Sequence, residues 1–180
     1  MANTETPMTV TKQTTSSPKP LPPSDKLGFG QFFTDHMLIA EFHKGQWSQP
    51  EIKPYGPFHL DPSASVLHYG QALFEGMKAF RRQDQSLCLF RPDYNFRRMN
   101  TGAERLCMPA LPSSIFIEGI KELVRTEARW VPEDPQCSLY LRPTLIGTEP
   151  FLGVRPSHQY LFFVIASPVG SYYGQGAERG

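Results

Sequence analysis

Proline is the residue that most constrains how this chain can fold. The sequence of 180 residues has 18 prolines, roughly twice the share found in average proteins. Because proline fixes φ and lacks a backbone N–H group, it interrupts helices and is poorly tolerated inside sheets. Prolines cluster in residues 1–26 and 50–62. We therefore expect no helix in the second half of residues 1–26. Along residues 50–62 we expect a series of turns.

The first segment is also rich in Ser and Thr and has almost no large apolar side chains. Such a composition buries too little surface to order a chain, so residues 1–26 are expected to form a flexible tail. The tail has no apolar core like that of a secretory signal, and the first arginine of the chain is Arg81, which disfavours a mitochondrial presequence. We predict a cytoplasmic protein, with mitochondrial import left open.

Composition excludes several classes of protein. Lys and Arg total 18 against 17 Asp and Glu, and the net charge of +1 argues against a basic nucleic-acid-binding module. The cysteines Cys88, Cys107 and Cys137 form neither a disulfide framework nor the paired spacing of a zinc site. No apolar run approaches the ~18 residues of a membrane span. We expect a soluble protein of a reducing compartment, without membrane, nucleic-acid or metal partners.

The apolar patterns predict strands, then two helices, then strands. Apolar residues recur at helical spacing after Pro92 and again after Ser113 and Ser114. Residues 160–166 are almost entirely apolar, as is typical of a buried central strand. Other strands are expected at 37–42, 47–53, 64–69, 77–81, 86–91 and 138–145, and one helical turn at 71–75. This order predicts an α+β fold, a mostly antiparallel sheet with helices packed on one side.

Two groups of residues are candidates for an apolar pocket and a phosphate site. Tyr69 and Phe74 lie beside glycines 70 and 76, which permit sharp turns, so the rings could wall a pocket. Core packing is the more ordinary interpretation of the same residues. Arg98 lies on the first expected helix, and its planar guanidinium suits a phosphate. A solvated basic helix face is the alternative.

A third group lies on the expected strand 138–145. Tyr140 and Arg142 share one face of that strand because side chains alternate, and a phenol beside a guanidinium suits a carboxylate ligand. Pro143 instead favours an ordinary edge strand. The following loop, 147–154, is apolar enough to meet a ligand or a second chain. The sequence has no Ser/His/Asp pattern, metal-ligand spacing or phosphate loop.

Taken together, these segments resemble the branched-chain amino acid aminotransferases, which are fold-type IV enzymes dependent on pyridoxal 5′-phosphate. The resemblance extends over about residues 27–175 and implies the family's N-terminal small domain. It is carried by the segments 29–37, 67–80, 89–99 and 138–150. The family's reaction transfers the amino group of Leu, Ile or Val to 2-oxoglutarate, giving a branched 2-oxo acid and glutamate.

The resemblance also implies roles for individual residues. Arg98 matches the arginine that grips the cofactor phosphate, and Arg142 matches the arginine that recognises the acidic co-substrate. Leu152 and Val154 match a loop that reaches the neighbouring subunit of a homodimer, and Tyr172 matches a tyrosine that closes over substrate. The apolar wall of the substrate pocket is implied for Phe29, Tyr69, Phe74 and Tyr140.

One departure from the family pattern concerns catalysis. Family members bind the cofactor through a lysine of a second domain, which also moves the proton, and no lysine of this sequence lies in that context. We therefore assign no catalytic residue and expect weak cofactor binding and no activity from this chain alone. The resemblance implies a domain at 27–167, an interdomain linker at 168–180, and a second domain absent from the sequence.

Two other functions stay open at this point. The chain could be a non-catalytic domain that pairs with or regulates a full-length subunit, which the apolar loop 147–154 permits. It could also come from a D-amino acid aminotransferase or an aminodeoxychorismate lyase, although residues 140–150 disfavour that relationship.

Overall fold

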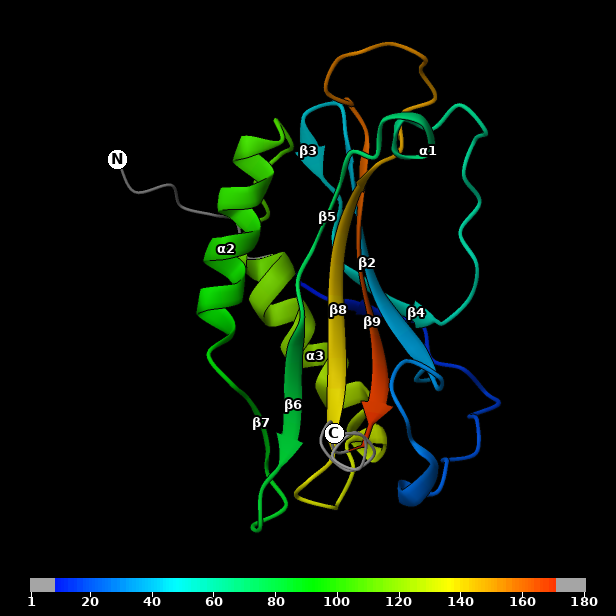
Figure 1. The fold of residues 1–180 in the computed structure, drawn as a ribbon, viewed down its shortest axis with the longest axis vertical. Coiled ribbons are helices and arrows are strands. Elements are labelled where there is room, and N and C mark those ends of the chain that lie inside the picture. Colours follow the sequence, from blue (N-terminus) through cyan, green and yellow to red (C-terminus); the bar gives the residue numbers. More distant parts are fainter. Residues whose placement is uncertain (1–8, 171–180) are drawn as a thin grey trace, which may run out of the picture.

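The structure, a computed structural model, describes residues 9–170. A nine-stranded sheet forms its centre, with the longer helices against one face (Figure 1). The strands are β1 Thr11–Lys12, β2 His36–His43, β3 Gln46–Trp47, β4 Glu51–Pro54, β5 Ala72–Phe74, β6 Met77–Arg81, β7 Leu87–Leu89, β8 Ser138–Gly147 and β9 Tyr160–Val169. The helices are η1 Ser24–Lys26, α1 Ser65–Tyr69, α2 Pro92–Arg105, η2 Ser114–Glu118, α3 Gly119–Thr126 and η3 Ala128–Trp130.

The strands run in the order β1-β4-β2-β9-β8-β6-β7, with β3 paired to β2 and β5 paired to β8. Every pairing is antiparallel except β1 with β4, which is parallel. The predicted α+β class and its mostly antiparallel sheet are therefore confirmed. Strand β9 lies between β2 and β8, as its continuous apolar sequence predicts.

The main core lies between the sheet and the helices α2, η2 and α3. Alternation along β8 turns Leu139, Leu141 and Leu145 towards this core, where each is fully buried. Helix α2 begins with Pro92 at a first-turn position, where the missing N–H costs nothing, and buries Met99 and Ala103. Asp93 lies in the first turn of α2 but makes no side-chain cap, since Arg91 holds the N-cap position.

Two short predictions were wrong. Residues 64–69 were expected as a strand, but Ser65–Tyr69 forms α1, which ends where Gly70 takes a left-handed φ of 63°. Residues 71–75 were expected as a helical turn, but Ala72–Phe74 forms β5 against β8. Both segments are too short for apolar periodicity to separate a strand from a helix, and Ala72–Phe74 becomes a strand because β8 lies beside it.

The described part of the expected flexible tail is attached to the sheet. Thr11 and Lys12 pair with β4, the Thr15 backbone N–H donates to Nε2 of His36 over 2.9 Å, and that of Lys19 donates to Oδ1 of Asp35 over 2.8 Å. These contacts differ from the expectation for residues 9–26, because backbone groups and buried side chains hold the segment without large apolar residues. We call residues 9–26 the N-terminal strap.

Pro143 lies in a central strand, so the edge-strand alternative is wrong. Strand β8 pairs with β6 up to Leu141 and with β5 from Thr144, so Pro143 faces the joint between those two strands. There the Pro143 carbonyl accepts a hydrogen bond from the Glu75 backbone N–H over 2.9 Å. Because no ladder donor is needed at the joint, proline is tolerated there.

A second, smaller core covers part of the opposite face. Met37, Ile39, Ile146 and Leu161 are buried there beneath aromatic and aliphatic side chains of residues 55–66. The four-proline segment 50–62 thus includes β4 and part of this cover. Among residues 9–170, no helix combines the length and apolar character needed to cross a bilayer.

Candidate functional site

Strand β8 presents Tyr140 and Arg142 on the face opposite the helices, next to two exposed phenylalanines. Nη2 of Arg142 donates to the Tyr140 hydroxyl over 2.7 Å, and the Arg142 guanidinium carbon lies 4.3 Å from the centre of the Phe74 ring. The rings of Phe29 and Tyr140 are 5.0 Å apart and tilted by 57°. We call Phe29, Phe74, Tyr140 and Arg142 the aromatic–arginine cluster.

This cluster offers both apolar surface and a fixed positive charge. Phe29 is 55% and Phe74 61% exposed, so both rings present open apolar faces. Arg142 makes one side-chain hydrogen bond within residues 9–170, which leaves most of its N–H groups for an incoming acceptor. The cluster can therefore contact an aliphatic group and pair with a carboxylate at the same time.

Glu75 and Arg98 form an ion pair beside this cluster. Arg98 donates from Nε and Nη2 to the two carboxylate oxygens of Glu75, each over 2.6 Å. Asn95, one turn earlier on α2, donates to Oε2 of Glu75 over 2.9 Å. Burial acts to raise the pKa of Glu75, but the hydrogen bonds from Arg98 and Asn95 outweigh it and hold the pKa below its usual range.

Gly76 links the two groups because it permits a close approach of Tyr140. A Cβ atom on Gly76 would lie 2.6 Å from the Tyr140 hydroxyl oxygen, closer than real Cβ contacts allow. The residue before it, Glu75, holds Arg98. The joint between β5 and β6 therefore positions both the aromatic–arginine cluster and the Arg98 guanidinium.

We expect Gly76→Ala to destabilise the chain by about 1–3 kcal/mol, the usual cost of forcing an extra methyl group into a packed site. The Tyr140 ring must move away and its hydrogen bond with Arg142 is lost. Gly56→Ala is the matched control, since nothing lies within 4 Å of its Cβ position. Urea unfolding of both variants provides the measurement, and equal midpoints would contradict the close approach.

Within residues 9–170, Tyr69, Leu152 and Val154 share no side-chain hydrogen bond or ring contact with the cluster. Tyr69, at the end of α1, is 45% exposed and faces the His68 ring at 6.3 Å. Leu152 and Val154 lie in the 148–159 connection and are 63% and 95% exposed. No ring contact among the described residues joins Tyr69 to the cluster. Tyr172 lies outside the described residues.

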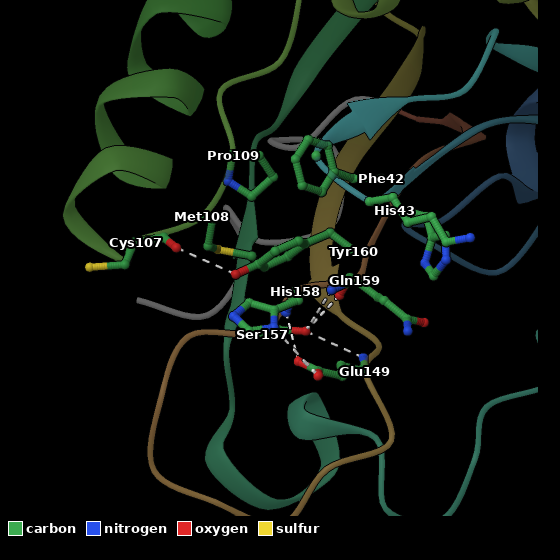
Figure 2. Close-up of a pocket in the computed structure, with 12 residues that line it drawn as sticks. Phe42, His43, Cys107, Met108, Pro109, Glu149, Ser157, His158, Gln159 and Tyr160 are labelled. Atoms are coloured by element: carbon green, nitrogen blue, oxygen red, sulfur yellow. Dashed lines mark hydrogen bonds and ion pairs between the residues drawn. The ribbon is translucent and has the colours of Figure 1, made fainter.

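A hollow of about 670 Å³ lies elsewhere, beyond the ends of α2 and β2 and at the start of β9 (Figure 2). Tyr160 forms its wall, with its hydroxyl donating to the Cys107 carbonyl over 3.4 Å. Glu149 of the apolar loop 147–154 lines this hollow, but none of the individual site residues proposed from the sequence does. It is lined by Phe42, His43, Lys44, Gly45, Cys107, Met108, Pro109, Glu149, Ser157, His158, Gln159 and Tyr160.

Glu149, which lines the hollow, is paired within the chain. Both oxygens of Glu149 accept from Arg155 over 2.9 Å, and the His158 backbone N–H donates to the same carboxylate over 2.7 Å. The hydrogen bond from Arg155 is the main reason that the pKa of Glu149 falls to about 2. These contacts hold the 148–159 connection in place.

Comparisons with known proteins agree with the resemblance. Branched-chain-amino-acid transaminase 1 of Bacillus subtilis is 50% identical over 157 residues, covering 87% of this chain and 44% of that protein. Branched-chain-amino-acid aminotransferase 2 of the same organism is 46% identical over 173 residues, covering 95% of this chain and 47% of that protein. The chain thus spans less than half the length of these curated relatives. No protein-family profile matches it.

A solved structure supports the same relationship. The T.th. branched-chain amino acid aminotransferase, solved with pyridoxamine 5′-phosphate, matches with a TM-score of 0.54 and 27% sequence identity. The match covers 77% of this chain and 42% of that one. Over most of its length, the chain is homologous to the N-terminal part of branched-chain aminotransferases.

Proposed function

We propose that this chain, as a homologue of that N-terminal part, supplies the phosphate grip and part of the substrate pocket of a branched-chain amino acid transaminase. The whole protein would transfer the amino group of Leu, Ile or Val to 2-oxoglutarate. The observation that carries the proposal is the aromatic–arginine cluster beside the Glu75–Arg98 pair. Around the joint between β5 and β6 there are then aromatic rings that can contact an aliphatic side chain. Arg142 can bind a carboxylate there, and Arg98 can bind a phosphate.

The described residues fit the phosphate end of pyridoxal 5′-phosphate. The Arg98 side chain is 72% exposed, and its Nη1 group has no acceptor within residues 9–170. Such a group binds a phosphate through charge-assisted hydrogen bonds. When bound, the cofactor would supply an electron sink for breaking the bond between the substrate's α-carbon and its hydrogen. The lysine that holds the cofactor would belong to a second domain, so no activity is expected from this chain alone.

The cluster accounts for the two kinds of substrate. Phe29, Phe74 and Tyr140 would contact the aliphatic side chain of Leu, Ile or Val. Arg142 would pair with the side-chain carboxylate of glutamate or 2-oxoglutarate while it remains fixed by Tyr140. One arginine at the rim thus serves the acidic substrate without placing a charge beneath the aliphatic one.

The remaining residues implied by the resemblance belong to the same proposal. Tyr69 would extend the pocket wall, and Tyr172 would close over the substrate. The exposed Leu152 and Val154 would reach the pocket of a second subunit in a homodimer. The free cysteines Cys88 and Cys107 suit the reducing conditions of the cytoplasm, which we propose as the location.

A chimera tests this function. The matched 157 residues of this chain replace their counterpart in transaminase 1 of Bacillus subtilis, which is 50% identical there. We expect the chimera to transaminate Leu, Ile and Val with 2-oxoglutarate. Introducing Arg142→Ala should raise the KM for glutamate by about 10-fold or more and change the KM for leucine less, because only glutamate has a second carboxylate.

The chimera also needs a control for folding and loading. The cofactor absorbance of the purified chimera, compared with that of the parent enzyme, shows whether the graft has folded around the cofactor. A loaded chimera that accepts none of the three branched substrates would contradict the proposed function.

A further inference from the structure

The Glu75 carboxylate is buried yet accepts hydrogen bonds from an exposed arginine. Its side chain is 4% exposed, whereas that of Arg98 is 72% exposed. Asn95 donates to Oε2 of Glu75 over 2.9 Å and to the Gly76 carbonyl over 3.3 Å, which fixes the carboxylate against the β5–β6 joint. The charged head of Arg98 is therefore held at the protein surface by a rigid, buried partner.

The pairing uses one edge of the guanidinium and leaves the other free. Glu75 accepts from Nε and Nη2, so both N–H groups of Nη1 and the second N–H group of Nη2 point away from the carboxylate. Those groups form the end of the planar fork, which can bind two oxygens of one anion. Unpaired arginine side chains sample many rotamers, and fixing one costs binding free energy.

The packing beneath the pair adds to this rigidity. A Cβ atom on Gly102 of α2 would lie 2.9 Å from Cδ1 of Leu73 in β5, so helix and strand are in close contact. Glu75 follows β5 directly, and its backbone N–H is bound to Pro143 of β8. The distance between the helix that carries Arg98 and the strand end that carries Glu75 is thus set by close packing of Leu73 against Gly102.

We propose that Glu75 is a positioning residue that orients Arg98 for the phosphate of the cofactor. The inference rests on the proposed function for the identity of the phosphate. Glu75 does not touch the anion. It binds the Nε edge of Arg98 and turns the Nη1 edge outward, so the anion meets a fork that is already ordered. A negative charge close to an anion site is unfavourable in itself, so orientation must outweigh repulsion.

Phosphate titration of the 180-residue chain, labelled with ¹⁵N-arginine, tests this inference. Inorganic phosphate is the probe, and the Arg98 side-chain NMR signals, identified by their loss in Arg98→Lys, are the readout. We expect saturable shifts of the Arg98 signals in the unmodified chain. Glu75→Gln should weaken phosphate binding by about 10-fold, the usual effect of removing a partner that orients a ligand-binding group.

Asp93→Asn is the matched control. Asp93 lies in the first turn of α2, 3.9 Å from Arg97, and its loss removes the same charge without touching Arg98. Charge alone predicts tighter phosphate binding in both variants, whereas positioning predicts weaker binding only in Glu75→Gln. Equal or tighter binding by Glu75→Gln, or no response of Arg98 in the unmodified chain, would overturn the inference.

Asn95→Ala is a less disruptive variant, which tests the same inference if Glu75→Gln does not fold. Asn95→Ala releases one oxygen of Glu75 but keeps the carboxylate and both of its bonds to Arg98. It should weaken phosphate binding less than Glu75→Gln, and unchanged affinity would count against the inference. The proposed function fails separately, because it is tested by the substrates that the chimera accepts and not by phosphate binding to this chain.

Discussion

Replacing Phe116 with alanine is expected to lower the free energy of unfolding by about 3–5 kcal/mol, the usual cost of deleting a buried aromatic ring. Phe116 is fully buried in η2. Its ring lies 5.9 Å from that of Phe162 on β9 and 5.7 Å from that of Phe96 on α2. Removal of this ring would leave a cavity where two helical segments meet the sheet, and the backbone can collapse into it only in part.

Phe90→Ala is the matched control for this core substitution. Phe90 is 72% exposed and its ring lies 5.9 Å from the Arg91 guanidinium, so its loss should cost less than about 1 kcal/mol. Urea unfolding followed by tryptophan fluorescence measures both variants. Similar midpoints for Phe116→Ala and Phe90→Ala would show that η2 does not pack against the sheet as described.

The second large effect is expected at Asp35, which attaches the N-terminal strap to the domain. Its carboxylate accepts from Nε1 of the buried Trp130 over 2.8 Å, from Nη2 of Arg129 over 2.7 Å and from the Lys19 backbone N–H over 2.8 Å. Asp35→Asn places an amide donor among these donors. We expect a loss of about 2–4 kcal/mol, because each buried donor left unpaired costs about 1–3 kcal/mol.

The same carboxylate predicts a dependence of stability on pH. Burial acts to raise the pKa of Asp35, but hydrogen bonds from Trp130, Lys19 and Arg129 outweigh it and lower the pKa below its usual value. A carboxyl with a lowered folded-state pKa stabilises the fold above its unfolded pKa of about 3.9, and this stabilisation is lost as pH falls towards the folded-state value. Asp35→Asn should therefore flatten the loss of stability below about pH 4.

Asp25→Asn provides the control for both effects. Asp25 lies in η1 of the same strap and is exposed to solvent. Its substitution should change the unfolding free energy by less than about 0.5 kcal/mol. Denaturant unfolding between pH 3 and 7 is the measurement. A pH dependence for Asp35→Asn that parallels that of the unmodified chain would contradict the assignment.

The parts of the fold that the sequence predicted are those with long, consistent patterns. The largely buried strand β9, the helix that begins at Pro92 and the alternation of Tyr140 and Arg142 along β8 each depend on residues close in sequence. Residues 64–69 were predicted as a strand and residues 71–75 as a helical turn, but they form the helix α1 and the strand β5. Each segment spans too few residues for its pattern to decide between the two. The conformation of β5 depends on its pairing with β8, which lies far along the chain.

Local pattern also could not predict the N-terminal strap or the full surroundings of Arg98. The strap is held by Asp35, His36 and a parallel pairing with β4, all of which involve residues distant in sequence. Arg98 could be proposed as a phosphate ligand from its residue type and its helix. Its pairing with Glu75 required the contact between α2 and the end of β5, which no periodicity encodes. The division into residues 27–167 and 168–180 stays a prediction.

The hairpin of β8 and β9 also has a consequence for how the chain reaches this structure. Its strands pair without interruption from Ser138 with Val169 to Gly147 with Tyr160, and residues 148–159 connect them. Closing so short a loop costs little entropy, whereas β2 must reach β9 across more than a hundred intervening residues. We therefore expect the hairpin to form early in folding and β2 to join it late. Substitutions in β2 should then mainly accelerate unfolding, while substitutions in the hairpin should mainly slow folding.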